Sequence, residues 1–188
     1  GATVNDVVLA ICSGALRRYL AHHRELPAET LIAFAPISVR TESQRGKGGN
    51  QLSGMLVALH TQETDPLKRL ARIHDATTGS KELTRAVGAR ALTDITQFMP
   101  GALAALAGRL VTSTGLLRRL STLANCVITN VPGPQVPLYM TKARMVANFG
   151  LGLPIDGMGL FHVVFSYAGT VTITFTASRR QMPAPDFY

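Results

Sequence analysis

The sequence has little of the chemistry that marks metal-binding, disulfide-stabilised or membrane-spanning proteins. It contains two cysteines, no tryptophan and only 6% aromatic residues. Cys12 and Cys126 lie in apolar runs far apart in the chain, without Cys or His at metal-ligand spacing. This pattern supports neither a metal site nor a disulfide framework, and it is typical of a reduced, cytosolic compartment. Arg, Gly or Pro interrupts the long apolar runs well before the ~20 residues that a membrane-spanning helix needs.

Acidic residues are also scarce. The chain of 188 residues has 11 Asp and Glu against 19 Lys and Arg, a net charge of +8. The basic residues fall as scattered pairs without interleaved aromatics, so we expect no nucleic-acid binding. Three interpretations of the charge remain open: contacts with phosphates on a small molecule, attraction to an anionic membrane surface, and a merely solvated basic face.

The order of periodic segments predicts one α/β layered domain with a mixed sheet. A capping box at residues 3–6 predicts a helix that fades at residues 22–23, and Asp65 followed by Pro66 predicts the start of another. Residues 83–123 have a helical pattern with a break at Pro100 and Gly101, and residues 102–110 carry an Ala/Leu stripe. Strands are expected at residues 31–39, 52–60, 126–131, 143–149, 160–167 and 171–177.

Some details of these elements can be tested directly. Pro36 predicts a bulge or an edge in its strand, and the Gly-rich, charged residues 41–50 predict a flexible loop. The second helix is expected to line one face with Leu67, Leu70 and Ile73. In the first helix, the expected apolar face consists of Val8, Ile11, Cys12, Ala15, Leu16, Tyr19 and Leu20.

Residues 147–167 hold a group of glycines, together with Pro154 and an Asp-Gly pair, between two runs of β-type residues. Glycine costs backbone entropy where it is not needed, so this density predicts a chain that bends sharply or approaches something closely. Such loops often carry binding or catalytic groups, and a wide hairpin connection without chemistry is an equal alternative. Gly150 and Gly152 lack the third glycine of a GxGxxG nucleotide loop.

Two polar residues on predicted strands could serve a site. His162 alternates with apolar neighbours on its strand, where a hydrogen-bonded core histidine is more common than a catalytic one. Asn130 stands just before a Pro-Gly-Pro sequence, where its amide either points at a ligand or caps the turn. The pair His22 and His23 lies at a helix end and is interpreted as solvated.

Taken together, several short motifs resemble a known family. They occur in this order: Thr-Val-Asn-Asp-Val-Val-Leu-Ala at residues 3–10, Pro-Ile-Ser-Val-Arg at 36–40, Thr-Asn-Val-Pro-Gly-Pro at 129–134, Pro-Leu-Tyr at 137–139, and Phe-Gly-Leu-Gly-Leu-Pro-Ile-Asp-Gly-Met-Gly-Leu at 149–160. The whole set resembles the C-terminal half of the bacterial wax ester synthase/acyl-CoA:diacylglycerol acyltransferases, a family abundant in actinobacteria. The resemblance covers essentially the entire chain.

The resemblance implies an α/β fold of the chloramphenicol acetyltransferase-like superfamily, with a mixed β-sheet packed with helices. Members of the family have two lobes, and residues 1–188 would form the C-terminal one. The family's catalytic His-His-x-x-x-Asp-Gly motif belongs to the N-terminal lobe and is missing here, since Pro27 and Ala28 stand where His22 and His23 would require Asp-Gly. The chain would therefore contain no catalytic residue and would be inactive alone.

The implied function is transfer of a long acyl group from acyl-CoA to diacylglycerol or a fatty alcohol, which makes triacylglycerol or wax ester. Acyl-CoA would be a substrate, with no resident cofactor and no metal. The partners would be the N-terminal lobe, the acyl-CoA, the lipid alcohol and an anionic membrane or lipid-droplet surface, at which a cytoplasmic protein would be peripheral. The residues expected to bind substrate or support the site are Asn5, Asp6, Thr129, Asn130 and His162.

Two alternatives of other kinds stay open. The first is a non-catalytic lobe for binding or assembly, which docks a partner lobe or an anionic membrane. The second is half of a condensation-type domain that acts on carrier-protein substrates. For Asn5 and Asp6, a position in the first turn of a helix favours a structural role next to the site over a catalytic one. The resemblance also implies that residues 149–160 form a bracing turn at the interface between lobes.

Overall fold

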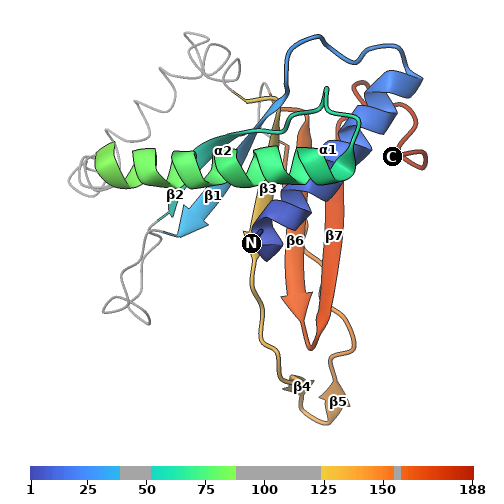
Figure 1. The fold of residues 1–188 in the computed structure, drawn as a ribbon. Coiled ribbons are helices and arrows are strands. Elements are labelled where there is room, and N and C mark those ends of the chain that lie inside the picture. Colours follow the sequence, from blue (N-terminus) through green and yellow to red (C-terminus); the bar gives the residue numbers. More distant parts are fainter. Residues whose placement is uncertain (39–51, 88–123, 155–157) are drawn as a thin grey trace, which may run out of the picture.

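The computed structural model describes residues 1–38, 52–87, 124–154 and 158–188. In these ranges the chain forms two helices and seven strands (Figure 1). The helices are α1 (Val4–His22) and α2 (Pro66–Val87). The strands are β1 (Ile32–Ser38), β2 (Leu52–Ala58), β3 (Cys126–Val131), β4 (Tyr139–Met140), β5 (Ala143–Arg144), β6 (Leu160–Tyr167) and β7 (Thr170–Ala177).

Five strands form a sheet in the order β2-β1-β3-β6-β7. The sheet is mixed, as the sequence predicts. β1 runs antiparallel to β2 and parallel to β3, β3 runs parallel to β6, and β6 runs antiparallel to β7. The β6–β7 hairpin turns at Ala168 and Gly169, whose φ angles of 45° and 83° are of the sign that a tight hairpin turn needs. β4 and β5 form a short ribbon beyond the turn end of this hairpin (Figure 1).

Both helices lie against the same face of the sheet (Figure 1). The predicted capping box begins α1, since the Thr3 side chain accepts from the Asp6 N–H while Asp6 accepts from the Thr3 N–H. α2 begins at the predicted cap, where Oδ1 of Asp65 accepts from the backbone N–H of Leu67 at 2.8 Å and of Lys68 at 3.2 Å. Neither helix, within the part of the chain that the structure describes, is long and apolar enough to cross a membrane.

The core lies between the helices and the sheet. Its fully buried members include Leu9 of α1, Ile73 of α2 and Val57 of β2. Cys12 and Cys126 are both in this core as free thiols, which agrees with the prediction that no disulfide links them. Burial raises the pKa of each thiol to about 12, so both stay protonated and unreactive at neutral pH.

The structure corrects the predicted apolar faces of both helices. Ile11 is 53% exposed and Leu67 is 75% exposed, although both were expected in the core. The buried face of α2 instead includes two polar residues, Arg69 and Thr77, with Ile73 between them at helical spacing. A search for apolar periodicity passes over such a face because two of its three residues are polar.

Three predicted elements have different bounds. α2 continues to Val87, so residues 83–87 belong to it and not to a separate helix. The strand expected at residues 143–149 is reduced to β5, because the chain after Arg144 leaves the ribbon. Pro36 lies in an unbroken ladder opposite Gly54, so it marks no bulge. The residue pairs between β1 and β3 end at Phe34, two residues before Pro36, so the predicted edge concerns only the β3 side of the strand.

The loop at residues 41–50, the break at Pro100 and Gly101 and the Ala/Leu stripe at residues 102–110 lie outside the described residues.

Candidate functional site

Asp6 is the centre of a polar cluster between the start of α1 and the middle of α2. Its side chain is fully buried. Oδ2 accepts hydrogen bonds from the N–H and the hydroxyl of Thr3 and from Nδ1 of His74, each at 2.8 Å. Oδ1 accepts from the Thr77 hydroxyl at 2.7 Å. These contacts join α1 to α2 and therefore support the structural role expected for Asp6.

The hydrogen bonds keep Asp6 ionised. Burial by itself raises the pKa of this carboxyl, but donation from Thr3, Thr77 and His74 outweighs it and lowers the pKa from 3.8 to about 2. The carboxylate also lies in the first turn of α1, where the positive end of the helix dipole favours a negative charge.

His74 and Thr77 are site residues that the sequence analysis missed. They are 68 and 71 positions from Asp6, so no local spacing signals the contact. Because a carboxylate only accepts, Nδ1 of His74 carries the proton in this hydrogen bond. A carboxylate and the histidine that it orients are two of the three members of a catalytic triad. The third member, a nucleophile, is not present here, because within the described ranges no hydroxyl or thiol donates to Nε2 of His74.

His162 is a hydrogen-bonded core residue, which agrees with the more common of its two interpretations. It is 1% exposed. Its Nδ1 lies 3.3 Å from the carbonyl oxygen of Val127 and its Nε2 lies 2.7 Å from the Tyr188 hydroxyl. The carbonyl requires a proton on Nδ1, so Nε2 of the neutral ring accepts from Tyr188. Burial lowers the pKa of His162 to about 4, which keeps the ring neutral at pH 7.

The remaining predicted residues, Thr129, Asn130 and Asn5, are half-buried. Thr129 is paired with Val163 and Asn130 with Val164, so the two side chains lie on opposite faces of the sheet. Asn130 shares the helix-covered face with His162. In the described part of the chain its amide makes no hydrogen bond that would cap the Pro-Gly-Pro turn. The structure thus does not gather the five predicted residues into one cluster.

The glycine segment, residues 147–154, lies flat on the sheet face opposite the helices. The Thr172 hydroxyl of β7 donates to the carbonyl of Asn148 at 2.9 Å, and the Thr174 hydroxyl donates to the carbonyl of Gly150. A Cβ atom on Gly150 would lie 2.3 Å from Cγ1 of Val163, and one on Gly152 would lie 2.1 Å from Cδ1 of Phe161. The glycines therefore allow the backbone of this segment to pack closely against the protein's own sheet.

The outer side of this segment is apolar and open. Phe149 is 65% exposed, and Leu151 and Leu153 are each 85% exposed, in alternation with the buried glycines. The nearby ribbon and its flanks add further exposed apolar side chains: Val136, Leu138, Tyr139, Met140 and Val146. We call these eight residues the apolar strip. Single exposed apolar residues are ordinary, but eight of them on one segment and the neighbouring ribbon favour an interaction surface.

No group of three His, Cys, Asp or Glu side chains in the described ranges could hold a metal ion. The polar contacts at Asp6 and His162 are instead internal to the fold.

Comparison with solved structures defines the class of the fold. A wax ester synthase/diacylglycerol acyltransferase from Marinobacter aquaeolei VT8 matches with a TM-score of 0.68 and 34% sequence identity, over 98% of this chain and 39% of that one. The fold is therefore a mixed β-sheet packed with helices, as predicted, and it matches part of a wax ester synthase/diacylglycerol acyltransferase.

Sequence comparisons narrow the class to a family. The family model described as the WS/DGAT (wax ester synthase/diacylglycerol acyltransferase) C-terminal domain matches residues 48–188. A putative diacylglycerol O-acyltransferase of Mycobacterium tuberculosis is 37% identical over 97% of this chain and 40% of its own length. An O-acyltransferase of Acinetobacter baylyi is 34% identical over 96% of this chain and 38% of its own length. The chain belongs to the WS/DGAT family and spans about 40% of the length of these relatives.

Proposed function

We propose that the chain is the C-terminal lobe of an enzyme that transfers a long acyl group from acyl-CoA to diacylglycerol or a fatty alcohol. The observation that carries this proposal is the match of nearly the whole chain to diacylglycerol O-acyltransferases, of which it covers about 40%. Acyl transfer from a thioester to an alcohol needs a base at the hydroxyl and donors for the oxyanion. Both ring nitrogens of His162 are bound inside the core, and in the described ranges no nucleophile lies at Nε2 of His74. These two histidines therefore suit neither role, and we assign the base to an N-terminal lobe.

The apolar strip supports docking of such a lobe. Phe149, Leu151 and Leu153 project from a segment that hydrogen bonds and close glycine contacts hold rigidly on β6 and β7. A rigid apolar surface gives up little conformational entropy when it is covered. Covering it with the second lobe would also exclude water from a reaction site between the lobes, which acyl transfer requires to avoid hydrolysis of the thioester.

The first test is an assay of the 188-residue chain with a long-chain acyl-CoA and either diacylglycerol or a fatty alcohol. We expect no ester product from the chain alone, and ester formation when a lobe that carries His-His-x-x-x-Asp-Gly is supplied or fused ahead of it. Turnover by the isolated chain would show that the base is in this lobe and would overturn the proposed division of roles.

A pair of variants tests the docking surface. Leu151→Asp with Leu153→Asp places two charges on the apolar strip, so we expect loss of lobe association, measured by co-sedimentation, and loss of activity with it. Leu56→Asp is the matched control, since Leu56 is 43% exposed on β2, at the opposite edge of the sheet. Equal effects of the control and the double variant would contradict docking at the strip.

The net charge of +8 supports a second element of the proposal, a peripheral position at an anionic membrane or lipid-droplet surface. Binding to vesicles that contain anionic lipid should weaken as salt rises, because exposed charges are screened. Absence of binding at low salt would remove this element and leave the acyltransferase proposal intact.

A further inference from the structure

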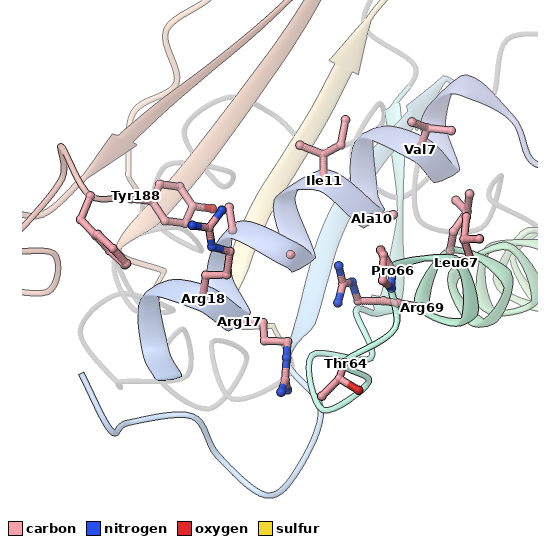
Figure 2. Close-up of a pocket in the computed structure, with 14 residues that line it drawn as sticks. Val7, Ala10, Ile11, Arg17, Arg18, Thr64, Pro66, Leu67, Arg69 and Tyr188 are labelled. Carbon is pink, nitrogen blue, oxygen red and sulfur yellow. The ribbon is translucent and has the colours of Figure 1, made fainter. Parts of the chain in front are cut away.

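A groove of about 600 Å³ separates the outer sides of α1 and α2 (Figure 2). The function proposed above does not use it. One end is apolar and open, with Val7 and Ile11 of α1 opposite Leu67 of α2. Two of these residues, Ile11 and Leu67, were predicted on the apolar faces of their helices but are exposed. Its volume is in the range of sites for small molecules.

The other end of the groove is basic. Arg17, Arg18 and Arg69 line it, and none of its lining residues is acidic. Figure 2 shows the Arg69 side chain between the two helices, with Arg17 and Arg18 further along α1. Two carboxylates whose charges act on Arg69 have other partners: Asp65 caps α2 and Glu63 pairs with Arg72 at 3.4 Å.

Arg69 is the best evidence that this end is a built site. It is 7% exposed, and in the described ranges its guanidinium donates one hydrogen bond, from Nη1 to the backbone carbonyl of Glu63 at 2.8 Å. Its Nε is buried without a hydrogen-bond partner. Burial first and then the charge of Arg17 lower the pKa of Arg69. The carboxylates of Glu63 and Asp65 offset this in part, but neither forms an ion pair with Arg69 in the described ranges, so the charge is only partly compensated.

Two further features hold Arg69 in place. A Cβ atom on Gly14 of α1 would lie 2.9 Å from Nη2 of Arg69, so the glycine makes room for the guanidinium. A glycine inside a helix is destabilising relative to alanine. Arg17 is held next to it by the carbonyls of Thr61 and Gln62, which accept from its Nη1 at 2.8 and 3.1 Å. These bonds use neutral acceptors and leave both positive charges in place.

We propose that this groove binds an amphiphile that has one alkyl chain and an anionic oxygen head group, of the phosphate type. The head group would lie at Arg69, Arg17 and Arg18, where planar guanidinium groups match the geometry of phosphate oxygens. The alkyl chain would lie along Val7, Ile11 and Leu67. The inference goes beyond the proposed function, since binding needs neither the other lobe nor turnover.

The test is calorimetry of the 188-residue chain with three probes: dodecyl phosphate below its micelle-forming concentration, inorganic phosphate, and dodecanol. We expect dodecyl phosphate to bind with one-to-one stoichiometry, at least about tenfold more tightly than either of the others. Equal affinity for inorganic phosphate would mean a site for free phosphate, and equal affinity for dodecanol would mean a purely apolar groove. Either result overturns the proposal.

Single-residue variants test which end of the groove binds the head group and which end binds the alkyl chain. Arg69→Gln should weaken dodecyl phosphate binding at least about tenfold. Arg18→Gln should weaken it about threefold, and this variant guards against misfolding because Arg18 is exposed. Ile11→Asn should weaken dodecyl phosphate but not inorganic phosphate. Arg144→Gln, which removes a distant exposed charge on β5, is the matched control and should have no effect.

Equal weakening by Arg144→Gln and Arg18→Gln would show a general charge effect and refute the site. Unchanged affinity in both Arg18→Gln and a folded Arg69→Gln would refute it as well. Because all of these measurements are of binding, their failure is distinguishable from a failure of the proposed acyltransferase function.

Discussion

Replacement of Asp6 tests how the two described helices are held together. Four donors converge on its carboxylate from Thr3, His74 and Thr77, at 2.7 to 2.8 Å. Asp6→Ala removes the acceptor shared by all four donors, of which only the Thr77 hydroxyl is fully buried. Asp6→Asn retains one oxygen, and the Thr77 hydroxyl can turn to accept from the new amide because it also reaches the carbonyl of His74 at 2.9 Å. The two variants therefore separate loss of the acceptor from loss of the charge.

The sizes of the two effects follow from the contacts. Hydrogen bonds to a charged group contribute about 1.5–3 kcal/mol, and we expect Asp6→Ala, which removes several of them, to lower the free energy of unfolding by about 3 kcal/mol. The carboxylate itself stabilises the fold by about 2 kcal/mol, from its pKa of about 2 in the folded state against 3.8 otherwise. Asp6→Asn loses the charge but keeps most hydrogen bonds, so its cost should be near about 2 kcal/mol.

The same linkage predicts a pH dependence. The folded pKa of Asp6 is below its ordinary value, so its contribution is fully present above pH 3.8 and is lost as the pH falls to about 2. Other carboxyls titrate in this range too, but they are common to both proteins. The difference in stability between the original chain and Asp6→Asn should therefore shrink toward zero over that interval.

The assay is urea unfolding followed by circular dichroism, at pH 7 and in steps down to pH 2. The far-ultraviolet spectrum at pH 7 controls for the retained fold of each variant. A cost of Asp6→Ala below about 1 kcal/mol would show that the donors find other partners and would refute the reasoning. A constant difference between the original chain and Asp6→Asn from pH 5 to 2 would refute the assignment of the charge.

Two other predictions concern β6. Gly152→Val should lower stability by about 1–3 kcal/mol, because its Cβ would lie 2.1 Å from Phe161 and would lift the segment off the sheet; thermal unfolding checks this, and an unchanged midpoint would contradict it. The pKa of His162 is lowered from 6.5 to about 4, so stability should fall as the pH decreases through that interval, by about 3 kcal/mol. His162→Gln should remove this part of the pH profile, and an identical profile in the variant would contradict the burial of a neutral ring.

The elements that follow local rules were predictable from the sequence. The capping box of α1 and the Asp65 cap of α2 each depend on residues within three positions of one another. The strands β3, β6 and β7 were predicted to within one residue because a continuous apolar run and a turn limit each of them. The family was recognisable for a related reason, since ordered motifs are a property of the chain and not of its folding.

The contacts within and between elements could not be predicted in the same way. Asp6 was singled out as a site residue, but its partners His74 and Thr77 were not, because nothing near Asp6 in the chain indicates a helix 68 residues away. The same limit applies to Arg69, whose burial depends on the glycine opposite it on α1. Polar residues on a buried helix face break the apolar pattern that sequence reasoning follows.

The sequence by itself determined the family, the order of helices and strands, and the absence of a catalytic histidine motif. Tertiary structure decided what the glycine segment approaches, and it is the sheet of the same chain, at Val163 and Phe161. It also decided which apolar residues stay outside, since Ile11, Leu151 and Leu153 are as apolar as the core residues beside them. The physical reason is that the hydrophobicity of a side chain determines the free energy gained when it is buried. Which element covers that side chain depends only on how the elements pack.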